Sequence, residues 1–99
     1  MVAQLAVSLA KLGHAVEAED AIGKAVSLAP TDSTVRFREA VVYAEIGKRR
    51  EALAGLEAAL KHGYGTVRVA DDEDLAPIRD TAEFKALLQQ YGSPKPGGS

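Results

Sequence analysis

Apolar side chains recur at spacings of three and four positions through residues 1–65, which is the pattern of amphipathic α-helices. The pattern is interrupted three times and resumes with a rotated phase after each interruption. It therefore predicts four helices, at residues 2–12, 15–28, 33–46 and 49–62. The apolar residues include 18 alanines, a composition that favours close contact between helices over the bulky core of a β-sandwich. We expect an all-α protein.

Glycine, proline and small polar residues mark the boundaries between these helices. Gly13 and Gly47 follow the first and the third helix, and glycine readily adopts the left-handed conformation that ends a helix. Pro30 cannot continue a helix, and Thr31 or Asp32 offers an oxygen that would cap the next one. Each pair of helices is therefore expected to form a hairpin.

The sequence repeats itself when it is shifted by 34 residues. In this register alanine falls on alanine and glycine falls on glycine. The structural repeat positions are Ala6, Gly13, Ala18, Ala25 and Pro30 in the first copy and Ala40, Gly47, Ala52 and Ala59 in the second. Small side chains at these positions would let the helices of one unit approach closely.

A 34-residue hairpin with small residues at fixed points, a glycine turn and a closing proline resembles the tetratricopeptide repeat (TPR), over residues 2–65. The resemblance implies a TPR-like right-handed superhelix of two helix-turn-helix repeats with a C-terminal capping helix. Residues 1–91 would then be a single domain, although Tyr64 stands in the second copy where the first has Pro30. Its parts would be repeat one (1–30), repeat two (31–65), an acidic connector (66–80) and a capping helix (81–91), before a disordered tail (92–99).

The region after the second repeat is expected to close the end of the array. We interpret the acidic run at residues 71–74 as a solvated loop. Asp80 begins a pattern similar to a capping box, and the apolar stripe along residues 81–91 needs a surface to cover. Leu75 and Ile78 would act as additional plugs. This segment also resembles the closing part of repeat arrays at the C-terminal ends of larger bacterial proteins, some with kinase or cyclase domains.

The first hairpin has no predicted cover on its other side. Its first helix begins within two residues of Met1, so one face of the hairpin lacks the neighbour that an array would give it. We interpret the chain as part of a longer array. Because exposed apolar patches of a few hundred Å² are usually occupied, this N-terminal face could also make a homo-oligomer.

Composition narrows the classes of function. The 99 residues contain no cysteine, which excludes disulfides, cysteine zinc sites and a thiol nucleophile. With 12 basic and 14 acidic residues, and aromatic side chains at only 5%, nucleic-acid binding is not expected. No apolar run approaches the roughly 20 residues of a membrane-spanning helix, and no basic residue precedes residues 2–10 as in a signal peptide. We expect a cytoplasmic protein without membrane contact.

Candidate chemical motifs fail on inspection. A calcium loop starting at Asp72 would need an oxygen ligand where Ala76 stands and a glycine where Pro77 stands. No nucleophile has a base and an orienting acid at a recognisable spacing. The basic residues 48–50 are interpreted as a solvated edge. We therefore expect no enzyme, no metal site and no cofactor.

The remaining candidate is a binding surface. In the tetratricopeptide family the first helix of each unit lines the concave wall, which the resemblance places at Ala3, Val7, Ala10, Lys11, Thr34, Phe37, Val41, Ala44 and Glu45. These residues would hold a peptide or a helix of a partner protein, in noncatalytic protein–protein interaction. Two alternatives stay open: a structural or regulatory appendage of a larger enzyme, and self-association. The apolar members of the set could also simply pack between repeats.

Overall fold

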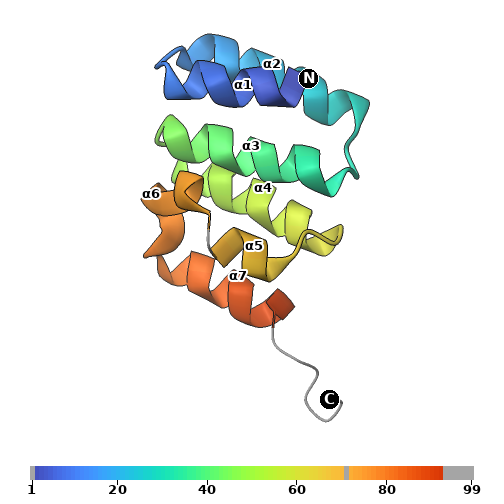
Figure 1. Cartoon of the computed structure of the whole chain (residues 1–99), viewed down its shortest axis with the longest axis vertical. Helices are drawn as coiled ribbons and strands as arrows, with labels where there is room; N and C mark the ends of the chain where they lie inside the picture. Colours follow the sequence, from blue (N-terminus) through green and yellow to red (C-terminus); the bar gives the residue numbers. More distant parts are fainter. Residues whose placement is uncertain (1, 71, 93–99) are drawn as a thin grey trace.

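The computed structural model describes residues 2–70 and 72–92, and within them every regular element is helical (Figure 1). The elements are α1 (Val2–Lys11), α2 (Ala15–Leu28), α3 (Ser33–Glu45), α4 (Arg49–Lys61), α5 (Thr66–Ala70), the 3-10 turn η1 (Glu73–Leu75), α6 (Ala76–Arg79) and α7 (Ala82–Gly92). The predicted all-α class is confirmed for this part of the chain. The five predicted helices each lie within one residue of their expected ends.

Glycine ends α1 and α3 in the same way. Gly13 and Gly47 both have φ of +87°, in the left-handed region that glycine tolerates. In the first turn the His14 N–H donates to the Leu9 carbonyl at 2.9 Å, and the equivalent bond 34 residues later measures 2.8 Å. This six-residue closure satisfies carbonyls at the helix end and turns the chain back on itself. Two antiparallel hairpins result, α1–α2 and α3–α4.

The junction between the hairpins is fixed by a proline and an aspartate. α2 ends two residues before Pro30, in agreement with the sequence prediction. Asp32 is the cap of α3, because its Oδ1 accepts the backbone N–H groups of Thr34 (2.9 Å) and Val35 (3.1 Å). The carboxylate thus satisfies two donors that the helix itself leaves without partners.

The helices are stacked along the long axis of the molecule, with α1 and α2 at one end, α3 and α4 in the middle and α7 at the other end (Figure 1). The alanines of the repeat positions are buried between them: Ala6, Ala18, Ala25, Ala40, Ala52 and Ala59. One apolar cluster, which includes Ile22 and Val42, joins α1 and α2 to α3. A second joins α3 and α4 to the C-terminal segment and includes Leu56 and Phe84.

The acidic connector is more structured than the sequence suggested. Residues 66–80 were expected to contain a solvated loop at the acidic run, but η1 occupies residues 73–75, and α5 and α6 flank it. Asp72 caps η1 by accepting the Asp74 N–H at 2.8 Å. Leu75 and Ile78 are buried in the second cluster, as their predicted role as plugs requires. The connector is therefore part of the core, and residue 71 lies outside the described residues.

The start of α7 differs from the expected capping box. Thr81, not Asp80, is the residue whose side chain caps the helix, because Thr81 Oγ1 accepts the Phe84 N–H at 3.1 Å. The same hydroxyl donates to the Ile78 carbonyl at 2.7 Å, so one side chain joins α6 to α7. Gly92 belongs to α7, and the rest of the expected tail, residues 93–99, lies outside the described residues.

Candidate functional site

A small cleft opens where the first hairpin, α3 and the connector meet. Its volume is about 210 Å³. Helices α1 and α3 form one wall, and α5 with the start of η1 forms the other. The lining residues are Val7, Thr34, Phe37, Arg38, Val41, Tyr64, Arg68, Asp72 and Asp74. We call this the concave cleft.

Two stacked aromatic rings form the floor of the concave cleft. Phe37 and Tyr64 lie nearly parallel, with ring centroids 4.3 Å apart and an interplanar angle of 8°. The Arg68 guanidinium lies 4.8 Å from the centre of the Tyr64 ring, at cation–π distance. The Tyr64 N–H donates to the Ala59 carbonyl at 2.9 Å, which fixes the aromatic residue at the end of α4. Ring stacking and a backbone hydrogen bond thus hold the base of the cleft.

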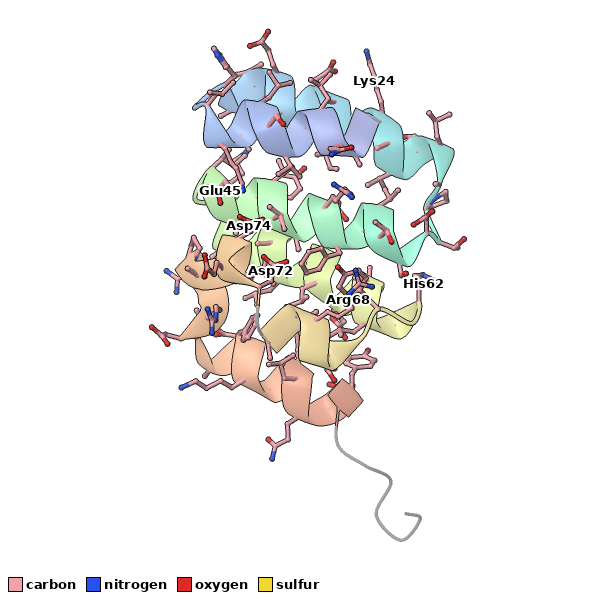
Figure 2. The ribbon with its side chains drawn as sticks, viewed as in Figure 1. Lys24, Glu45, His62, Arg68, Asp72 and Asp74 are labelled. Carbon is pink, nitrogen blue, oxygen red and sulfur yellow. The ribbon has the colours of Figure 1, made fainter. Side chains whose placement is uncertain are left out.

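An ion pair crosses the cleft at one end. Lys11 Nζ of α1 lies 2.7 Å from Asp74 Oδ1 of η1, and both side chains remain partly exposed. The hydrogen bond to Asp74 raises the pKa of the Lys11 ammonium, and the nearby charges of Glu45 and Asp72 raise this pKa further. Figure 2 shows Asp74 between Glu45, near the edge of the molecule, and Asp72, nearer its middle. The pair connects the first hairpin to the connector.

The two arginines of the cleft are less engaged than its carboxylates. Asp72 and Asp74 are held by the cap of η1 and by Lys11, whereas Arg38 has no ion pair with any residue that the structure describes. Arg68 is exposed and faces Tyr64. A ligand in the cleft would meet aromatic and aliphatic surface next to two guanidinium groups. Such a lining suits binding of an apolar side chain with a nearby hydrogen-bond acceptor.

The structure divides the predicted concave residues into three groups. Val7, Thr34, Phe37 and Val41 come together in the cleft. Lys11 and Glu45 lie at its rim. The remaining three residues, Ala3, Ala10 and Ala44, are buried in the helix packing and cannot contact a ligand without unfolding. Phe37 and Val41 are also largely buried, so they offer only an edge.

Sequence reasoning missed Arg38, Tyr64, Arg68 and the connector carboxylates as part of this site. Tyr64 carried one signal, because an aromatic residue stood where the repeat pattern expected a proline. Arg68 follows it by one helical turn, so the two would lie on the same face once α5 was known. The acidic run carried the opposite signal, since charge runs usually mark solvated segments.

A second feature is the N-terminal face, which the structure leaves open. Large apolar side chains are exposed there: Leu5 by 55%, Leu12 by 72% and Val16 by 83%. Leu28, at the end of α2, is exposed by 80%. Leu5 and Val16 line the same hollow on this face, together with Leu9.

Comparisons with protein-family models, with curated proteins and with solved structures find no match to this chain. In the described residues no helix has the length and apolar character needed to cross a bilayer. No group of three or more histidine or carboxylate side chains gathers there in a way that could hold a metal ion.

Proposed function

We propose that this chain is a noncatalytic protein-interaction module of the tetratricopeptide type, which binds a short peptide segment in the concave cleft. The observation that carries the proposal is the meeting of Val7 of α1 with Thr34, Phe37 and Val41 of α3 in one cleft. These four residues belong to the concave wall that the resemblance to the tetratricopeptide repeat implies. Two equivalent helices of successive hairpins thus contribute to the same concave surface, which is how a repeat array recognises an extended ligand.

The repeat assignment has support beyond the sequence shift. The turns at Gly13 and Gly47 share the same φ and the same backbone closure 34 residues apart. Repeat alanines are buried between neighbouring helices in both hairpins. A short amphipathic capping helix, α7, covers the end of the second hairpin through Phe84.

The geometry sets the size and chemistry of the ligand. A volume of about 210 Å³ accommodates one or two side chains of a peptide rather than a whole helix. The aromatic floor of Phe37 and Tyr64 favours an apolar anchor, and Arg38 and Arg68 favour a peptide carbonyl or a carboxylate beside it. The buried alanines of α1 and α3 set the shape of the wall without making contact.

The test begins with peptides selected from a random display library against the whole chain. Thr34→Trp is expected to weaken the selected peptides by about tenfold or more, because the bulky ring would fill an exposed part of the lining. Thr31→Trp is the matched control, since Thr31 is exposed in the turn before α3 and does not line the cleft. Equal binding to both variants would refute the assignment of the cleft.

A further inference from the structure

A second cleft lies between α4, in the middle of the molecule, and α7, at the end opposite the N-terminal face. It has a volume of about 640 Å³. Its apolar lining is Leu53 and Ala54 of α4 with Ala86 and Leu87 of α7. We call it the α4–α7 cleft. It shares no lining residue with the concave cleft.

Basic residues flank the α4–α7 cleft. Arg49 and Arg50 line it, and neither makes an ion pair with a described residue. Of the two carboxylates in the lining, Glu57 accepts a hydrogen bond from the Tyr91 hydroxyl at 3.4 Å. Glu83 is the other, at the first turn of α7. The lining thus holds two guanidinium and two carboxylate groups, and the guanidinium groups at the start of α4 have no ion pair with a described residue.

The N-terminal face carries an excess of acidic groups. Its hollow, with a volume of about 600 Å³, is lined by the apolar Leu5, Leu9 and Val16 and by Glu17, Asp20 and Lys24. Asp20 is 3.4 Å from Lys24, and Glu17 is 3.3 Å from the His14 imidazole, but all four side chains are more than half exposed. Such surface pairs are weak and exchange readily for better ones.

We propose that the N-terminal face of one copy docks into the α4–α7 cleft of a second copy. Leu5 and Val16 would lie against the small residues of the cleft, while Glu17 and Asp20 approach Arg49 and Arg50 of the other copy.

Alanine-lined grooves already receive helices inside this fold. The α3 helix lies on the alanines of α1 and α2, with Val42 buried among them. Ala54 and Ala86 offer the same close approach in the α4–α7 cleft. A helix of a second copy therefore meets the same kind of surface there that α3 meets on the first hairpin.

The position of the two surfaces fixes the type of assembly. α1 and α2 lie at one end of the long axis and α7 lies at the other (Figure 1). Contact between different surfaces of identical copies is heterologous, so a chain of copies always keeps one unpaired surface at each end. We expect an open, concentration-dependent chain of copies, independent of any ligand in the concave cleft.

The experiment is sedimentation velocity with light scattering, from about 10 μM to about 1 mM protein. The average mass of the parent protein is expected to rise with concentration. Leu5→Glu should raise the dissociation constant by about tenfold or more, because it replaces an apolar contact with a charge held against the small residues of the cleft. Arg50→Glu should have an effect of the same size, because it places a carboxylate opposite Glu17 and Asp20. Lys61→Glu is the matched control, as it reverses a charge at the exposed end of α4 outside the cleft.

Mixing the two variants gives the sharpest result. Leu5→Glu keeps an intact α4–α7 cleft and Arg50→Glu keeps an intact N-terminal face, so an equal mixture should form a heterodimer that grows no further. If Leu5→Glu loses helicity, Val16→Glu replaces it at a more exposed position. A parent mass that stays constant would overturn the proposal. So would association that Arg50→Glu leaves unchanged, or variants that fail to recombine.

Discussion

The burial of Leu75 makes the connector testable as a structural element. Leu75 is 0% exposed in η1, within the same cluster as the aromatic and aliphatic residues of α3, α4 and α7. Leu75→Ala would remove a side chain from a packed site, which typically costs about 2–5 kcal/mol of unfolding free energy. Leu28→Ala is the matched control, because the same atoms are removed from a residue that is 80% exposed. Its expected cost is within about 0.5 kcal/mol.

Thermal unfolding followed by circular dichroism separates the two variants. For a domain of this size, 1 kcal/mol corresponds to roughly 4–8 °C in Tm, so a loss near 3 kcal/mol lowers Tm by roughly 12–24 °C. Leu28→Ala should change Tm by no more than about 4 °C. If the connector were a solvated loop, both variants would unfold at nearly the parent temperature. That outcome would refute the reasoning.

Three further predictions concern backbone, packing and charge. Gly47→Ala should lower the free energy of unfolding by about 1 kcal/mol or more, because φ is +87° there. Gly23→Ala in α2, where open space surrounds the new Cβ, should leave the free energy of unfolding unchanged or raise it by up to about 1 kcal/mol. Denaturant titration of both variants tests the difference. Ala52→Leu should cost about 1–3 kcal/mol by overpacking a fully buried site, and an unchanged midpoint would show that this face is not a helix contact. Burial raises the pKa of Glu39 above its ordinary value of 4.5, although the charge of Arg36 opposes the shift. The folded state therefore binds this proton more readily than the unfolded state. The free energy of unfolding of the parent, measured against that of Glu39→Gln, should rise as the pH falls from the folded-state pKa of Glu39 towards 4.5. Unfolding curves of both proteins over that pH range check the sign.

The long helices could be predicted because their signals are redundant. α2 shows several turns of apolar periodicity and ends just before Pro30. The glycines at 13 and 47 have no side chain that would oppose a positive φ. Where periodicity, capping and turn residues all indicate the same boundary, tertiary contacts do not move the end of the helix.

The connector could not be predicted in the same way because its helices are too short to display a period. α5, η1 and α6 contain five, three and four residues, about one turn each. These short elements are stabilised by burial of Leu75 and Ile78 against the second hairpin, which is a tertiary contact. The acidic run was wrongly predicted to be a solvated loop, because Asp72 caps η1 and Asp74 pairs with Lys11.

The concave surface was predicted only in part for a related reason. The resemblance to the tetratricopeptide repeat implies which side of α1 and α3 would face inward, but it does not indicate what covers that side. Here Tyr64 stacks on Phe37, and the connector packs over Val41. Residues that would be free in an open groove are thus partly covered by the closing segment. Of the predicted residues, Thr34 and Lys11 stay exposed, and Val7 and Glu45 stay partly exposed.

The difference between equivalent positions of the two hairpins bears on how copies associate. Val16 in the first copy corresponds to Arg50 in the second, 34 residues later. Two α4–α7 clefts face to face would bring four guanidinium groups together, and two N-terminal faces would bring Glu17 and Asp20 of both copies together. Only the pairing of unlike surfaces brings Glu17 and Asp20 to Arg49 and Arg50.

Salt therefore discriminates between the two kinds of assembly. Screening weakens attraction between opposite exposed charges and relieves repulsion between like ones, with a Debye length of about 10 Å at 0.1 M and about 3 Å at 1 M. Head-to-tail contact through Arg50 should thus weaken as salt is added, while a symmetric dimer through the N-terminal face should strengthen, since Glu17 and Asp20 of both copies would then repel less. The apolar contribution of Leu5 and Val16 responds in the same direction in both arrangements, so the difference between the two arrangements comes from the charges. An association constant that rises with sodium chloride between these limits would exclude the head-to-tail arrangement.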